Sequence, residues 1–291
     1  MDEALSHWLR LREPCDVAAR SKELTRAIAD TVPVGEPVYI LDLATGEGSN
    51  VRFLADWLPG PQHWLAVDRS PTLLRGLCER ISSWGKERGY TVRTDTDRCR
   101  LHGADIECDV ETRQVDLGAL DRHDIFARRH LVTASALLDL VSTRWLRALV
   151  AHCQKERASA LFTISYNGHF SCAPADAEDG LVRDLMNEHQ KTDKGLGGPA
   201  AGPDAVARAV RCFAEAGYHV QCEPSDWALG PAEQDVQRAL VDGWAEAATE
   251  IAPDRTSTIA DWHRRRLAHV EAGRSRVIVG HDDLAAWLPH E

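Results

Sequence analysis

Apolar runs and amphipathic segments alternate along the first half of the chain. Residues 38–43 form an apolar run rich in β-branched and aromatic side chains, which is typical of a strand buried on both faces. Apolar residues at helical spacing follow from Val51, and a second apolar run covers residues 63–67. Ser70 and Pro71 then provide a helix cap and a first helical residue. This alternation predicts a parallel sheet with helices on its faces.

The segment before this unit is predicted to be helical. Apolar residues recur at helical spacing through residues 1–32, and Pro14 is expected to interrupt them. Pro33, Gly35 and Pro37 indicate a linker into the first strand.

Residues 84–112 are the hardest part of the chain to assign. Residues 90–94 and 105–110 alternate with period two on either side of Gly103, so we expect a hairpin inserted before the third core strand. We place that strand at residues 113–117. A third strand beginning at Tyr90 is the alternative.

The second half continues the α/β pattern. A fourth strand is expected to end near residues 134–135 and a fifth to cover 159–165, with a helix between them from about Thr143 to Glu156. Residues 166–198 are expected to form a long irregular or lid-like connection. The remaining predicted elements are a helix at 203–216, a strand at 218–222, helices at about 232–251 and 257–272, and a last strand at 275–280.

Composition and charge narrow the class of protein. The 291 residues suit one large domain, and the formal net charge of −11 disfavours nucleic acid as a partner because such affinity needs concentrated Lys and Arg. We see no secretory signal and no apolar stretch near the roughly 20 residues that cross a membrane, and the 8 scattered cysteines show no zinc spacing. We therefore expect a cytoplasmic protein with reduced thiols, no membrane contact and no metal.

The stretch from Val38 to Val51 carries the first chemical signal. A strand, a turn with Gly46 and Gly48, and a helix form a nucleotide-binding element, because glycines let backbone amides approach a ligand. Ser49 and Asn50 are expected to cap that helix. A dinucleotide fingerprint would need a third glycine where Val51 stands, so NAD(P) is disfavoured.

When the same stretch is examined from Asp42 onward, before the first glycine, its pattern is Asp42-x-Ala44-x-Gly46-x-Gly48. It resembles the first motif of class I S-adenosylmethionine (SAM)-dependent methyltransferases, except that Ala44 stands where that family has its first glycine. Alanine fits there only if its φ stays below zero.

Three further matches follow in the order of that family. Asp68 ends the second strand, Asp116 and Leu117 end the predicted third strand, and residues 131–139 resemble the fourth motif. Each stands at the carboxyl end of a predicted strand, where open α/β sheets bind ligands. The resemblance covers residues 38–165, and the family's last helix and antiparallel strands would account for 203–280.

The resemblance implies a fold and a domain plan. The fold is a Rossmann-like, doubly wound, mostly parallel seven-stranded sheet with an antiparallel last strand, here with a helical N-terminal extension and an inserted hairpin. The chain would be a single domain: N-terminal helices (1–35), a SAM-binding core (36–165), a lid or substrate loop (166–202) and the C-terminal part of the fold (203–291).

The resemblance also implies a cofactor site that comprises Asp42, Ala44, Gly46, Gly48, Asn50, Asp68, Arg69, Asp116, Leu117 and Ala134. The turn amides would line the methionine and ribose of SAM, and Asp42 would reach the ammonium through water. Asp68 would accept from the ribose hydroxyls. Asn50 would either bind the cofactor carboxylate or cap its helix, and Arg20 is a second candidate for that carboxylate.

The remaining roles concern the adenine and the acceptor. Arg69 would cover the adenine, Asp116 would accept from its amino group with Leu117 against the ring, and the Ala134 carbonyl would face the ammonium. Methyl transfer is an in-line displacement that mainly needs alignment, and a general base only where the acceptor arrives protonated. His169 and His189 are the candidate bases, because histidine titrates near neutrality.

The sequence therefore predicts a methyltransferase that moves a methyl group from SAM to an O, N or C atom of a small molecule, leaving S-adenosylhomocysteine (SAH). Residues 134–137 replace the Asn-Pro-Pro-Tyr-like tetrapeptide of many nucleic-acid and protein amino-group methylators. The alternative is a SAM- or SAH-binding regulatory or partner protein without activity. The acceptor and the oligomeric state are not predicted.

Overall fold

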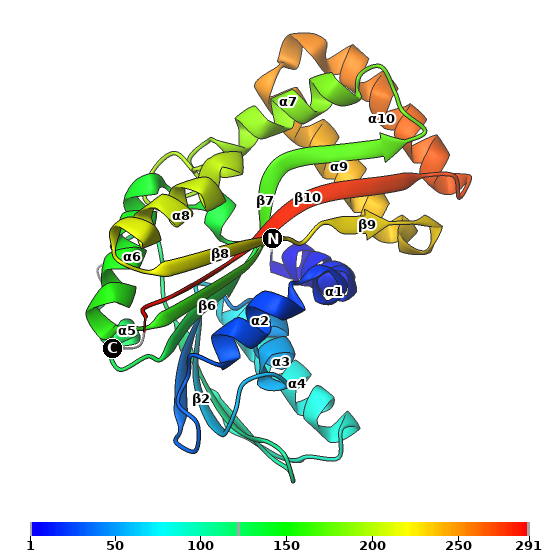
Figure 1. Ribbon diagram of the computed structural model, residues 1–291. Helices are drawn as coiled ribbons and strands as arrows, with labels where there is room; N and C mark the ends of the chain where they lie inside the picture. Colours follow the sequence, from blue (N-terminus) through cyan, green and yellow to red (C-terminus); the bar gives the residue numbers. More distant parts are fainter. Residues whose placement is uncertain (1, 121–122, 290–291) are drawn as a thin grey trace.

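One mixed β-sheet organises the computed structural model, which describes residues 2–120 and 123–289 (Figure 1). Within those ranges ten strands belong to the sheet, in the order β3-β4-β5-β2-β1-β6-β7-β10-β8 with β9 beside β10. The strands are β1 (Val38–Leu43), β2 (Pro61–Asp68), β3 (Thr91–Thr94), β4 (Arg98–His102), β5 (Glu107–Gln114), β6 (Leu131–Ser135), β7 (Ser159–Ala173), β8 (His219–Pro224), β9 (Trp227–Leu229) and β10 (Arg276–Trp287).

Strand direction confirms the predicted fold class. Strands β5, β2, β1, β6 and β7 pair in parallel, whereas β10 runs antiparallel to both β7 and β8. The seven core strands are contiguous in the sheet, and the β3–β4 hairpin extends it at the β5 edge. The fold is a Rossmann-like, mostly parallel sheet with an antiparallel last strand.

Helices cover both faces of this sheet. They are α1 (Asp2–Ala19), α2 (Lys22–Ala29), α3 (Ser49–Ala55), α4 (Pro71–Glu87), α5 (His123–Phe126), α6 (Thr143–Glu156), α7 (Asp179–Gln190), α8 (Ala205–Glu215), α9 (Gln234–Ile251) and α10 (Thr256–Glu271). Successive residues of β1 point to opposite faces, so Leu41 and Leu43 pack with α6 and α8 while Val38 and Ile40 pack with α2, α3 and α4. The sheet is therefore doubly wound.

Strands β7 and β10 continue beyond the core sheet and carry a second layer of helices (Figure 1). A third buried cluster packs these strand extensions against α7, α9 and α10, with Phe170 stacked on Trp244 at a ring distance of 4.0 Å. Helix α1 contacts α4 of the core as well as α9 and β9 of this extension. It therefore lies between the two parts of the molecule.

Three expectations about the elements need correction. Pro14 does not interrupt the first helix: α1 runs through it, and contacts of Arg10 and Glu13, in the turn before the proline, hold the helix in place. The chain breaks instead after Ala19, where the Ser21 hydroxyl caps α2.

The third core strand is β5, which begins and ends earlier than residues 113–117. Its first half pairs with β4 on one side and β2 on the other, so the alternation at 105–110 belongs to the core strand and not to the hairpin. The hairpin is β3–β4, and the strand starting near Tyr90 lies at the edge of the sheet. Val115 still donates to the Asp68 carbonyl, which continues the pairing of these strand ends.

Residues 166–198 are not an irregular lid. The segment begins with the second half of β7, which register shifts opposite β10 allow to extend to Ala173, and it then contains α7. Only a short turn at 174–178 and the part after Gln190 lack a helix or strand, apart from an isolated bridge between Asp193 and Pro199.

Candidate functional site

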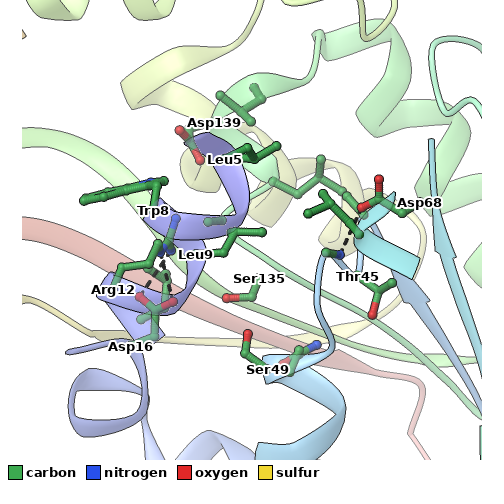
Figure 2. Close-up of a pocket in the computed structure, with 18 of the residues that line it drawn as sticks. Leu5, Trp8, Leu9, Arg12, Asp16, Thr45, Ser49, Asp68, Ser135 and Asp139 are labelled. Carbon is green, nitrogen blue, oxygen red and sulfur yellow. Dashed lines mark hydrogen bonds and ion pairs between the residues drawn. The ribbon is translucent and has the colours of Figure 1, made fainter. Parts of the chain in front are cut away.

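A cavity of about 510 Å³ opens at the carboxyl ends of β1, β2, β5 and β6. This volume lies in the ~300–1,000 Å³ range of small-molecule sites. Figure 2 shows its walls: Thr45, Ser49 and Asp68 follow the strand ends on one side, and Leu5, Trp8, Leu9, Arg12 and Asp16 of α1 lie opposite. Parallel α/β sheets bind ligands at this edge, so the sequence-predicted site and the cavity coincide.

The turn after β1 contains three left-handed residues, Ala44, Gly46 and Gly48, of which Ala44 and Gly46 line the cavity and Gly48 does not. Gly46 has φ +56° and Gly48 has φ +75°, and a Cβ on Gly48 would lie 2.8 Å from Leu77. Ala44 has φ +51°, which contradicts the expected negative value. A left-handed conformation costs an L-residue about 1–2 kcal/mol, so this turn holds Ala44 under strain.

Two other cavity residues share that conformation. Ala136 follows β6 with φ +54°, and Ile164 within β7 has φ +55°, although β-branched residues almost never adopt it. The Ile164 amide donates to the buried Asp283 carboxylate at 2.7 Å, which stabilises the bend in β7 there. Backbone strain of this kind is commonly found at ligand sites.

A buried polar cluster supports the turn from behind. Asp42 is fully buried and accepts from Thr45 Oγ1 at 2.5 Å and Asn50 Nδ2 at 2.7 Å. Burial raises the pKa of Asp42 to about 6, against the lowering effect of those donors and of Arg20. Asn50 also donates to Thr133 of β6 at 3.1 Å. The capping role proposed for Asn50 is therefore wrong, because Gly48 is the N-cap residue of α3 and Asn50 instead ties β1 to β6.

Asp68 holds the turn against the end of β2. Its Oδ2 accepts from the Gly46 amide at 2.9 Å and its Oδ1 from the Ser70 amide at 2.9 Å (Figure 2). Each carboxylate oxygen keeps a further lone pair for a ligand hydroxyl. Arg69, Asp116 and Leu117 line the same cavity, and Asp116 accepts from the Gly118 amide at 2.8 Å.

Ala134 does not line the cavity, because the strand end points Ser135 and Ala136 into it instead. Behind Ser135 lies Arg20, whose Nη2 donates to the Ser135 hydroxyl at 3.1 Å. Arg20 is buried and its Nε and Nη1 have no hydrogen-bond partner among the described residues. Burial lowers its pKa, although Asp16, Asp283 and Asp42 oppose this effect.

Helix α1 packs over the turn that follows β1. A Cβ on Gly46 would lie 3.0 Å from Leu9, so the helix contacts the turn directly. Glu47 within the turn accepts from Ser6 at 2.6 Å and from Arg10 at 2.9 Å. This cover was not predicted, because nothing in the spacing of residues 1–32 indicates what the helix packs against.

The part of the cavity farther from the turn is aromatic. Trp8, Tyr166, Trp227, Trp244 and His281 line it, from α1, β7, β9, α9 and β10. Burial, with Arg12 nearby, lowers the pKa of His281 to about 3, so this ring is uncharged. Sequence reasoning missed Trp227, Trp244 and His281, since no local pattern around them indicates a site.

The two histidines proposed as bases lie elsewhere. His169 is exposed and does not line the cavity. His189 lines a separate shallow pocket beside α9 and pairs with Glu250 at 3.0 Å. Asp139 does line the cavity, and it follows β6 in a short 3-10 turn (Leu138–Leu140).

The described residues offer neither a cluster of metal ligands nor a membrane-spanning helix. They contain no group of three or more His, Cys, Asp or Glu side chains placed to hold a metal ion. None of their helices is both long enough and apolar enough to cross a membrane.

Comparisons with known proteins give distant structural matches. No family model and no curated protein matches the chain. Solved structures similar to it include the cyclopropane synthase MmaA2 from Mycobacterium tuberculosis, at a TM-score of 0.45 and 10% identity over 90% of this chain and 82% of that one. A precorrin-6y C5,15-methyltransferase from Geobacter metallireducens GS-15 gives 0.42 and 10% identity over 93% of each chain. The [4+2]-cyclase SpnF gives 0.41 and 13% identity over 100% and 98%.

Proposed function

We propose that this protein is a SAM-dependent methyltransferase that acts on a small molecule. The observation that carries the proposal is the order of groups along one wall of the cavity. The left-handed turn at residues 44–48, the Asp68 carboxylate and residues 116–117 follow each other at three neighbouring strand ends. This order matches the methionine, ribose and adenine of SAM as the sequence motifs assign them.

The described side chains support a role for each part of the cofactor. Asp68 has lone pairs for the two ribose hydroxyls, while Leu117 and Arg69 offer an apolar side chain and a cation to the adenine. Asp42 supplies negative charge for the ammonium. Ser135 faces the cavity with Arg20 one hydrogen bond behind it, and this pair is suited to the cofactor carboxylate.

Transfer of the methyl group needs an acceptor held in line with the sulfur. The aromatic part of the cavity adjoins the wall assigned to SAM, so one cavity has room for both reactants. Such alignment, together with exclusion of water, accounts for much of the rate enhancement in a displacement of this kind. A protein that only bound SAM would have no use for that second part, which favours the enzyme over the non-catalytic alternative.

Calorimetric titration of the full chain with SAH, NADH and 5′-deoxy-5′-methylthioadenosine tests the cofactor. We expect micromolar SAH binding, and Asp68→Ala should weaken it about 100-fold because two hydrogen bonds to a charged acceptor are lost. Asp105→Ala, an exposed carboxylate far from the cavity, should leave affinity unchanged. Arg20→Gln should weaken SAH but not methylthioadenosine, which lacks the carboxylate. Binding of NADH in place of SAH would contradict the proposal.

Turnover separates the enzyme from the binder. Incubation with methyl-tritiated SAM and a metabolite extract should transfer label to a small molecule, and Asp68→Ala should abolish the transfer. Tight SAH binding without label transfer in any extract would support the non-catalytic alternative.

A further inference from the structure

The aromatic part of the cavity has the properties of an acceptor site for a flat ring. Trp227 and Trp244 are 2% and 3% exposed, and Tyr166 is 6% exposed. Together with Trp8 they present ring faces and edges from four different elements. Apolar side chains also line this part, among them Leu140, Met186, Leu240 and Val279. Walls of this kind bind planar apolar groups through burial and ring contacts.

Most polar groups in this part are neutral or already paired. His281 is uncharged, and burial raises the pKa of Tyr166, which keeps its hydroxyl protonated and donating to Asn187 at 3.0 Å. Arg12 makes two hydrogen bonds to Asp16, at 3.0 and 3.2 Å, and lies 5.2 Å from the centre of the Trp227 ring. The positive charge of Arg12 already lies at the Trp227 ring and would repel a cationic acceptor there. The aromatic part of the cavity therefore does not favour a cationic ligand.

Asp139 is the exception, because its carboxylate is buried and only partly used. It is 6% exposed, and its Oδ2 accepts a long hydrogen bond from Gln190 at 3.4 Å. Its Oδ1 has no hydrogen-bond partner among the described residues. Asp139 and Leu5 of α1 both line the cavity (Figure 2). A buried carboxylate oxygen without a donor is suited to a ligand that brings one.

We infer that the methyl acceptor is a flat aromatic compound with a hydroxyl group, and that Asp139 takes the proton of that hydroxyl. The inference rests on the proposed function. The acceptor oxygen forms a bond to the methyl carbon of SAM while the carbon–sulfur bond breaks. The bonding pair remains on sulfur, which becomes the neutral thioether of SAH. The hydroxyl proton moves to Asp139, so a sulfonium and a carboxylate are neutralised together and the product is a methyl ether.

The surroundings of Asp139 suit this transfer. Burial raises its pKa to about 6, although its own backbone amide, Arg12 of α1, the Tyr166 backbone of β7 and Lys194 all favour the carboxylate. It is therefore ionised at neutral pH but remains a better proton acceptor than an exposed aspartate. General bases with a pKa near the working pH are the efficient ones.

Binding of three naphthalene probes to the SAH-saturated protein tests the acceptor class. At about pH 8, where Asp139 is ionised, we expect 2-naphthol to bind at least about tenfold more tightly than 2-naphthoate or 2-(aminomethyl)naphthalene. Asp139→Asn should raise 2-naphthoate affinity about tenfold by removing like-charge repulsion. Asp184→Asn, an exposed carboxylate on α7, should change none of the three. Tightest binding of the amine, or no binding of any probe, would overturn the inference.

Turnover of 2-naphthol tests the proton acceptor. At SAM concentrations that saturate the protein at every pH, tritiated methyl transfer should give the methyl ether, with kcat/KM for 2-naphthol rising as pH rises through about 6, the value at which Asp139 loses its proton. Asp139→Asn should lower kcat about 100-fold or more, remove this pH dependence and leave KM little changed. Transfer that survives Asp139→Asn would overturn its role as base, and 2-naphthol that binds without being methylated would overturn the hydroxyl assignment. Loss of SAH binding would instead refute the proposed function.

Discussion

Glu13 of α1 and Arg52 of α3 form an ion pair in which Oε1 lies 2.5 Å from Nη2. The second oxygen of Glu13 accepts from Arg80 of α4 at 2.6 Å, and Arg52 also donates to the Glu47 carbonyl of the glycine turn at 2.7 Å. Arg52 is only 7% exposed, so few waters can replace its partner. This ion pair connects α1 to the two helices that follow the first two strands.

Glu13→Gln should therefore loosen α1. Removing one partner leaves a buried guanidinium without its carboxylate, and we expect the free energy of unfolding to fall by about 2–3 kcal/mol. Urea unfolding of both proteins measures this difference. Glu3→Gln, in the same helix but exposed, should change stability by less than about 0.5 kcal/mol. Equal effects of the two substitutions would show that the ion pair does not hold the helix.

Ala44→Gly should stabilise the protein. Glycine adopts the observed φ of +51° without the left-handed strain, and the gain is partly offset by the greater freedom of glycine in the unfolded chain. The expected net gain is about 0.5–1 kcal/mol, measured by thermal unfolding. Ala207→Gly on the exposed side of α8 is the matched substitution and should cost about 1 kcal/mol. A destabilised Ala44→Gly protein would mean that the alanine methyl group makes a packing contact worth more than the strain.

SAM affinity should fall as pH falls through about 6. The folded pKa of Asp42 is about 6, above its ordinary value of 3.8, because burial disfavours the charge more than Thr45, Asn50 and Arg20 favour it, while Asp68 raises the pKa further. The cofactor ammonium favours the carboxylate, so SAM binds the deprotonated protein best. Calorimetric titration with SAM across this pH range should show the weakening.

Asp42→Asn isolates that effect. The variant should bind SAM more weakly at neutral pH, with an affinity that no longer depends on pH near 6. The same raised pKa has the opposite consequence for the protein without ligand: the stability that protonated Asp42 contributes is present below about 4 and is lost as pH rises through about 6. SAM affinity that increases on acidification would contradict this assignment of Asp42.

The sequence predicted the core of the fold because the pattern of neighbouring residues is enough to identify each of its strands and helices. The apolar run at 38–43 and the helical period after Val51 need no distant partner to be recognised, and the strand ends at Asp68 and Ser135 follow from them. The position predicted for the third core strand was wrong because β5 is polar at every second position. Such alternation is typical of a half-exposed hairpin strand and not of a core strand. The φ of Ala44 was mispredicted because the fold, and not the residue, sets the conformation of that turn.

The aromatic part of the cavity could not be predicted in the same way. Trp8, Tyr166, Trp227 and His281 are far apart in the sequence, and they meet only because β7 and β10 extend past the core sheet and α1 folds between the two layers. The prediction of His169 and His189 as bases rests on their chemistry alone, within a segment expected to be a loop. The β-strand and helix formed there direct them away from the cavity.

Helix α1 takes part in both halves of the cavity, since Leu9 touches the glycine turn while Trp8 and Arg12 line the aromatic part. Undocking of this one helix would therefore expose both halves together. Exit of SAH and of the methylated product would then share a single opening event. In rapid-mixing experiments, a first turnover faster than those that follow would be the kinetic signature of that shared exit.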